Sequence, residues 1–150
     1  MDYAAALKLA LELASAEAVP DADVVGWDAL AKVTILANTF FGASLSPDAT
    51  PATVITDITP DQMESAAADG KRHKLIGRVW RDGGDVRASV APQLVDLDHP
   101  LAGVGGATNA MTITTDTLGD VTIVGPGAGR RETGFSLLND LIAIAKGSRS

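Results

Sequence analysis

The feature that most constrains the fold is a glycine-rich stretch near the C-terminus, V-T-I-V-G-P-G-A-G-R-R-E-T-G at 121–134. A β-branched run, alternate glycines and the apparent start of a helix look like the phosphate-binding turn of a dinucleotide enzyme. That turn needs G-x-G-x-x-G inside a βαβ unit, with an acidic residue about 20 positions later on a second strand. Here Arg130 occupies the sixth position, and one helix and a short tail follow. We therefore do not expect a self-contained dinucleotide-binding fold.

The pattern of the remaining segments predicts the fold class. Helical spacing, cap residues and terminating glycines predict helices over 3–14, 26–41, about 60–69 and about 132–146. Alternating or β-branched runs predict a short strand at 53–56, a hairpin turning at 82–84, and strands at 111–115 and 121–124. Clustered antiparallel strands with helices before and after them predict an α+β fold. We expect a mostly antiparallel or mixed sheet with helices packed on one face.

Composition excludes several classes of protein. The 150 residues fit one domain, the net charge is −7, and the cationic residues form no continuous basic face, which disfavours nucleic-acid binding. No apolar run is long enough to span a bilayer, so we expect a cytoplasmic protein without a membrane partner. The chain has no cysteine, and His99 has no second histidine nearby, so we expect a turn role for His99 and no metal site. The acidity fits either a solubilising surface or adaptation to high salt.

The glycine loop has two interpretations that the residues alone leave open. Gly125, Gly127, Ala128 and Gly129 could turn backbone N–H groups toward an anion at the start of a helix. Alternatively, the glycines allow a tight strand-to-helix turn packed under a neighbouring residue.

A second candidate site lies at the start of the 26–41 helix. Asp28 and Lys32 are four residues apart and share a helical face, which is ordinarily an exposed ion pair worth about 0.3–0.5 kcal/mol. However, Lys32 stands between Ala31 and Val33 in a largely apolar helix, and carboxylates precede it. A poorly solvated ammonium group gives up its proton more readily, as an acid/base in alcohol oxidation must. The pattern therefore also allows a catalytic interpretation.

Three blocks of sequence carry a resemblance to a known family. G-W-D-A-L-A-K at 26–32, D-H-P-L-A-G-V-G-G-A-T-N-A at 98–110 and G-P-G-A-G-R-R-E-T-G-F-S-L-L-N-D-L at 125–141 are similar to the catalytic half of homoserine dehydrogenase. The resemblance covers essentially the whole chain. It implies that residues 1–150 are the catalytic, substrate-binding and dimerising domain, incomplete at its N-terminal side. It also implies interconversion of L-homoserine and L-aspartate 4-semialdehyde in threonine and methionine biosynthesis.

The resemblance also implies roles for individual residues. Lys32 would transfer the proton, with Asp28 beside it to orient the lysine or the substrate, and Glu17 and Asp23 would bind homoserine. The loop at 125–129 would lie against NAD(P), which a domain absent from this chain would hold. Expected partners are the substrate, a separate nucleotide-binding subunit and a second copy in a homodimer. The alternative is a non-enzymatic remnant that acts as a dimerisation or interaction module.

Overall fold

A computed structural model describes residues 26–53, 55 and 58–147 of the chain. The expected helix over 3–14 lies outside the described residues. The chain divides into two compact units, Met1–Leu97 and Asp98–Ser150. Each unit is described by itself below.

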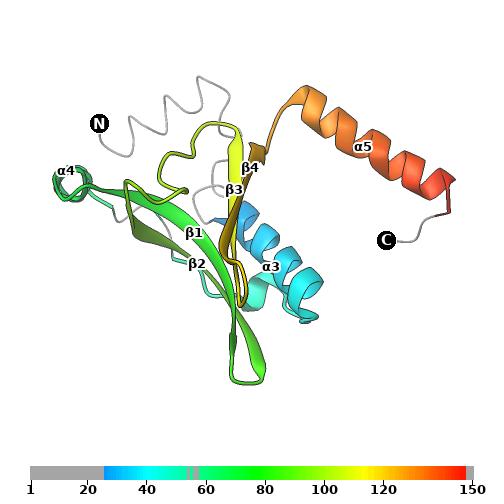
Figure 1. Cartoon of the computed structure of the whole chain (residues 1–150), viewed down its shortest axis with the longest axis horizontal. Helices are drawn as coiled ribbons and strands as arrows, with labels where there is room; N and C mark the ends of the chain where they lie inside the picture. Colours follow the sequence, from blue (N-terminus) through cyan, green and yellow to red (C-terminus); the bar gives the residue numbers. More distant parts are fainter. Residues whose placement is uncertain (1–25, 54, 56–57, 148–150) are drawn as a thin grey trace. The chain divides into compact units, whose positions relative to one another are not determined.

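The first unit is built on a helix packed against a β-hairpin (Figure 1). Helix α3, Trp27–Phe41, runs between Gly26 and Gly42, both of which have a positive φ. It packs on strands β1, Lys71–Asp82, and β2, Asp85–Asp96. The core between them consists of Leu30 and Val33 of the helix with Ala88 and Val90 of β2. Burial of such side chains contributes roughly 1.5–3 kcal/mol each when it is complete.

The buried face of α3 consists of Leu30, Val33, Thr34 and Ala37. Trp27 is 45% exposed and Ile35 is 63% exposed. The helix approaches β1 closely at a position where the strand has a glycine. At Gly77, an added Cβ would overlap Val33.

The β1–β2 hairpin confirms the turn predicted at 82–84. Asp82 pairs with Asp85 across Gly83 and Gly84, and Gly83 adopts a positive φ of 62°. A glycine with positive φ at the first central position is the pattern of a type II′ turn. The strand expected at 53–56 is not found at Thr53 or Ile55. Instead, Ala52 forms an isolated parallel bridge to Val90 at the β2 edge.

Helix α4, Pro60–Ala68, begins with the predicted capping box. The Gln62 N–H donates to the Thr59 hydroxyl at 3.3 Å, and the Thr59 N–H donates to the Gln62 side chain at 2.8 Å. Pro60 occupies the first helical position, where a missing N–H costs nothing. Gly70, with a φ of 68°, then leads into β1 as expected. A short 3-10 helix, η1, covers Pro47–Ala49 in the connection after α3.

The second unit contains a β-hairpin followed by a helix. Strands β3, Thr108–Thr115, and β4, Gly119–Pro126, pair antiparallel, and helix α5 covers Arg130–Ala145. The single sheet expected from the sequence is found as two separate two-stranded sheets among the described residues. The α+β class is confirmed. Strand periodicity specifies which face of a strand is apolar, but it does not specify which hairpins join edge to edge.

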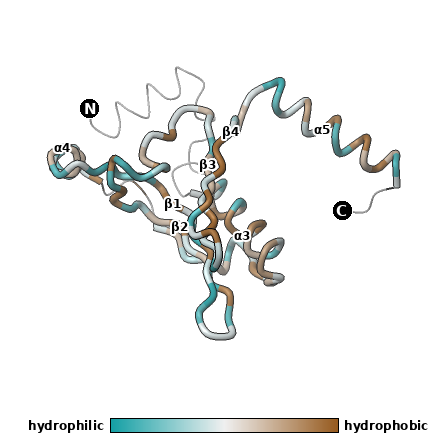
Figure 2. The backbone as a smooth tube through the Cα atoms, viewed as in Figure 1, coloured by the Kyte–Doolittle hydropathy of each residue, from teal (hydrophilic) through white to brown (hydrophobic). Residues whose placement is uncertain are grey.

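Apolar side chains of the second unit are largely exposed. Among its described residues, Ala102 is the one buried hydrophobic residue. Hydrophobic and hydrophilic residues alternate along the α5 tube (Figure 2). At 100° per residue, the large apolar side chains of α5 fall within about half of the helix circumference. The exposed members are Phe135, Leu137, Leu138, Leu141, Ile142 and Ile144. This apolar face of α5 is suited to further packing, because such a helix face is normally buried in a complete fold.

Candidate functional site

The structure brings together the two residues proposed for acid/base chemistry. Lys32 Nζ donates to Asp28 Oδ2 at 2.7 Å, on adjacent turns of α3. Helix geometry accounts for the contact, since side chains at i and i+4 lie one above the other. The contact is thus a local ion pair that involves no other described element.

The poor solvation expected for the Lys32 ammonium group is not observed. Its side chain is 52% exposed and that of Asp28 is 65% exposed. The sequence interpretation was wrong on this point because it treated the apolar neighbours Ala31 and Val33 as surroundings of the lysine. On a helix, adjacent residues point about 100° apart, so Val33 faces the hairpin while Lys32 points away from it.

The other two carboxylates assigned to substrate cannot be placed beside this pair. Glu17 and Asp23 both lie outside the described residues. Of the four residues proposed for catalysis and substrate binding, the structure therefore describes Asp28 and Lys32.

In the second unit, the backbone of the glycine loop is already hydrogen bonded. Gly127 N–H and Ala128 N–H both donate to the Ala107 carbonyl, at 2.7 and 3.2 Å. These are two of the groups that would have to face an anion if the loop were a phosphate cradle. The geometry favours the second interpretation, a tight strand-to-helix turn held by its neighbour.

Two side chains pack directly onto the loop glycines. A Cβ at Gly127 would overlap the Asn109 amide, and a Cβ at Gly129 would overlap the Glu132 carboxylate. Gly129 caps α5 with a φ of 145°, and Glu132 stands in the first turn of that helix. The negative charge that complements the N-terminus of α5 thus comes from the chain itself.

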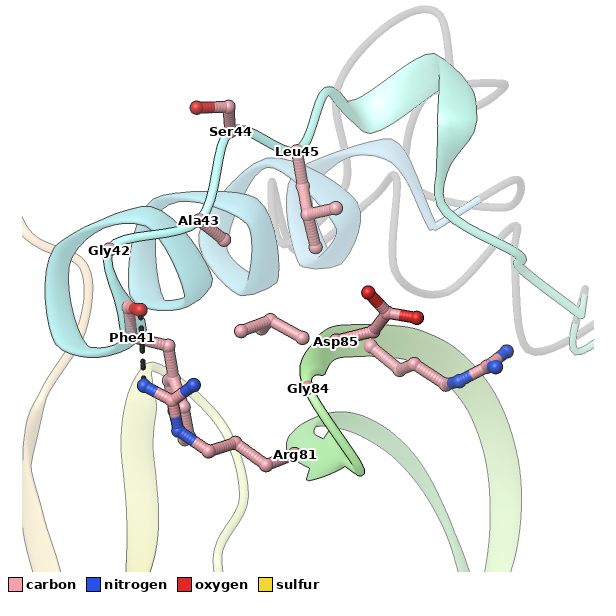
Figure 3. Close-up of a pocket in the computed structure, with 10 residues that line it drawn as sticks. Phe41, Gly42, Ala43, Ser44, Leu45, Arg81, Gly84 and Asp85 are labelled. Atoms are coloured by element: carbon pink, nitrogen blue, oxygen red, sulfur yellow. Dashed lines mark hydrogen bonds between the residues drawn. The ribbon is translucent and has the colours of Figure 1, made fainter.

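A cavity that sequence reasoning missed lies where the C-terminal end of α3 meets the β1–β2 turn (Figure 3). Its volume is about 550 Å³. The Arg81 guanidinium lies over the Phe41 ring, 5.6 Å from its centre, and donates to the Phe41 carbonyl at 3.4 Å. Arg87 Nε pairs with Asp82 at 2.7 Å. Arg81 therefore joins the helix to the hairpin, whereas Arg87 pairs within the hairpin. The contact between Arg81 and Phe41 requires tertiary proximity that sequence spacing does not reveal.

The two histidines have different surroundings. His99 Nδ1 accepts a hydrogen bond from Leu101 N–H at 3.1 Å, which confirms the predicted turn role. Among the described residues, the buried Nδ1 of His73 on β1 has no hydrogen-bond partner. It shares its strand face with Leu75 and Gly77, and period-two alternation alone could have placed it there.

Among residues 26–53, 55 and 58–147, no three histidine, aspartate or glutamate side chains gather as metal ligands would. No helix in this part of the chain is long and apolar enough to cross a membrane.

Solved structures share this fold. The crystal structure of S. aureus homoserine dehydrogenase at pH 6.5 matches with a TM-score of 0.89 and 35% identity, over 97% of this chain and 37% of that one. A putative homoserine dehydrogenase from Archaeoglobus fulgidus matches with a TM-score of 0.81 and 40% identity, over 96% of this chain and 43% of that one. Both identify the chain as similar to one portion of a dehydrogenase.

Sequence comparison gives the family. The family model for homoserine dehydrogenase matches residues 1–142. The NAD(+)-dependent homoserine dehydrogenase of Pseudomonas canavaninivorans is 46% identical over 145 residues, which are 96% of this chain and 41% of that protein. The chain belongs to the homoserine dehydrogenase family. The chain spans about two fifths of the length of the Pseudomonas relative and 37% of the S. aureus chain. It covers 34% of the Bacillus subtilis homoserine dehydrogenase, at 36% identity.

Proposed function

We propose that residues 1–150 form the substrate-binding, catalytic and dimerising portion of a homoserine dehydrogenase. In this role the chain interconverts L-homoserine and L-aspartate 4-semialdehyde with a nicotinamide cofactor, in the cytoplasm. The observation that carries the proposal is the preformed Asp28–Lys32 pair at 2.7 Å on α3, in a chain that belongs to this family. Glu17 and Asp23 are proposed to bind the substrate.

The chemistry requires a group that takes the hydroxyl proton of homoserine while a hydride leaves for the cofactor. A lysine amine can serve as this base, and in the reverse direction its ammonium returns the proton. Asp28 accepts a hydrogen bond from Lys32 Nζ on the exposed side of α3. The cofactor, NAD or NADP, would supply the hydride acceptor when bound, and Gly125, Gly127, Ala128 and Gly129 are proposed to lie against it.

The proposal includes a nucleotide-binding portion that acts together with this chain. Two observations support it. The chain covers 41% of the Pseudomonas relative, and the apolar face of α5 is exposed along the helix. Leu137, Leu141 and Ile144 on that face are 60%, 64% and 74% exposed, which suits a further protein surface. The exposed Val121 and Ile123 of β4 would similarly suit the second copy of a homodimer.

A hybrid enzyme tests the proposal. This chain replaces the matched 145 residues of the Pseudomonas relative, and homoserine-dependent reduction of NAD or NADP is followed by absorbance. We expect activity in the hybrid. Lys32→Ala should lower kcat by about 10²–10⁴-fold, the usual contribution of a positioned acid/base. Lys32→Arg should be equally impaired, because a guanidinium keeps the charge but does not release its proton.

The matched control is Lys71→Ala. Lys71 also forms an exposed ion pair, with Asp96 at 3.6 Å, and its side chain is 43% exposed. We expect the control hybrid to retain its kcat. Normal turnover by the Lys32→Ala hybrid would refute the catalytic assignment. A folded hybrid that neither binds homoserine nor turns it over would leave the chain as an interaction module.

A further inference from the structure

The Gly125–Gly129 loop contains three glycines in five residues and is therefore intrinsically flexible. Each glycine loses more conformational freedom on ordering than any other residue type. A loop of this composition keeps one shape only where neighbouring groups restrain it. Its contacts with β3 identify those groups.

One restraint comes from the backbone. The Ala107 carbonyl, just before β3, accepts the N–H groups of both Gly127 and Ala128. Two donors on a single acceptor hold the middle of the loop against the start of β3. Such bonds are readily exchanged for bonds to water when they are exposed.

The second restraint is the Asn109 side chain. Asn109 pairs with Gly125 in the β3–β4 register, and its amide extends forward to Gly127. There it occupies the place that a Cβ on Gly127 would fill, with amide carbon, nitrogen and oxygen all close to that position. The amide makes no hydrogen bond to the other described residues. Its contribution within the described structure is therefore contact with the loop.

We propose that Asn109 is a positioning residue that fixes the glycine loop in the shape that meets the nicotinamide cofactor. The cofactor part of this inference rests on the proposed function. The Asn109 amide packs against Gly127, whose N–H makes the shorter of the two bonds to Ala107. A loop that is already ordered binds a ligand without a further cost of ordering. The expected effect of Asn109 is therefore on cofactor affinity and not on the rate of proton transfer.

Hydrogen exchange in the chain itself tests the loop. With ¹⁵N-labelled protein, we expect Asn109→Ala to speed exchange at the Gly127 and Ala128 amides about tenfold, because local opening becomes easier. Asn109→Asp, which keeps the size and shape of the side chain, should exchange like the wild type. Asn139→Ala, an exposed asparagine on α5, is the control and should change neither amide.

A double variant makes the test specific to packing. Gly127→Ala alone inserts a methyl group into the Asn109 amide and should also speed exchange. In Asn109→Ala with Gly127→Ala, the new methyl group takes the space that the amide vacated. Exchange in the double variant should therefore be slower than in either single variant, a non-additive result expected only for residues in contact.

The hybrid enzyme tests the cofactor half of the inference, which is the expected effect of Asn109 on cofactor affinity. Asn109→Ala should raise the KM for NAD about tenfold, which corresponds to about 1.4 kcal/mol, while kcat stays within about twofold and the KM for homoserine is unchanged. Unchanged exchange at Gly127 and Ala128 would overturn the inference, as would faster exchange with an unchanged KM for NAD. Inactivity of the unmutated hybrid would instead overturn the proposed function and, with it, the cofactor half, while the exchange rates still decide the role of Asn109 in the loop.

Discussion

The close approach of α3 to β1 at Gly77 predicts that one added methyl group lowers the free energy of unfolding. A Cβ added at Gly77 would overlap the Val33 side chain and meet Val90 at 4.0 Å. Val33 is 4% exposed and Val90 is 1% exposed, so neither side chain has free space into which it can move. Gly77→Ala therefore forces the helix and strand apart.

The magnitude follows from two opposing effects. Overpacking a filled core costs about 1–3 kcal/mol. Loss of glycine freedom in the unfolded chain returns about 0.4–1 kcal/mol, because the φ of Gly77 is one that alanine can adopt. We expect a net loss of about 1–2 kcal/mol in the free energy of unfolding. With a urea dependence of about 2 kcal/mol per molar, the midpoint should fall by roughly 0.5–1 M.

Tryptophan fluorescence in urea is a direct assay for this prediction. The two tryptophans of the chain are Trp27 on α3 and Trp80 on β1, so both report on the first unit. Gly84→Ala is the matched control, because an added Cβ there meets nothing within 4 Å. If Gly77→Ala unfolds at the same urea concentration as Gly84→Ala, the close packing of α3 on β1 is refuted.

Two further substitutions test local hydrogen bonds of the first unit. Thr59→Ala removes the hydroxyl of the α4 capping box and should cost about 1 kcal/mol by urea unfolding, whereas Thr59→Ser should not; equal midpoints for both would contradict the capping role. Asn38→Ala removes an amide that bonds Leu45 N–H at 2.9 Å and the Leu45 carbonyl at 3.0 Å. For these exposed bonds we expect a loss of about 1 kcal/mol, and faster hydrogen exchange at Leu45 should accompany it; unchanged exchange there would show that the bonds do not form in solution.

Features specified by neighbouring residues were predictable from the sequence. The Thr59–Gln62 capping box, the turn at 82–84 and the span of α3 each depend on contacts within a few positions. The close packing of α3 on β1 was not predictable, because Val33 fits against a glycine, Gly77, more than 40 positions away.

The candidate sites show the same division. The Asp28–Lys32 contact follows from helical spacing, and the structure confirms it. The two hydrogen bonds from the loop N–H groups to the Ala107 carbonyl could not be inferred, because they depend on the register of β3 against β4. That register places Asn109 opposite Gly125. Glycine spacing alone left the free and the occupied backbone both open, and the structure shows that the Gly127 and Ala128 N–H groups are occupied.

The exposure of Lys32 sets a condition on the proposed chemistry. A proton-transfer lysine works best when water is excluded from the reacting atoms, yet its side chain is 52% exposed among the described residues. Substrate, cofactor and the nucleotide-binding portion must therefore cover it in the proposed enzyme. Acetylation of lysines, followed by mass spectrometry, measures how accessible the Lys32 side chain is.

In the chain alone, Lys32 and Lys71 should be acetylated to a similar extent, since their side chains are 52% and 43% exposed and both pair with an aspartate. In the hybrid enzyme with NAD and homoserine, Lys32 should become protected relative to Lys71, because the bound ligands and the partner surface exclude the reagent. Equal labelling of both lysines in an active, ligand-saturated hybrid would show that Lys32 stays in solvent during turnover. Proton transfer would then have to be assigned to another group.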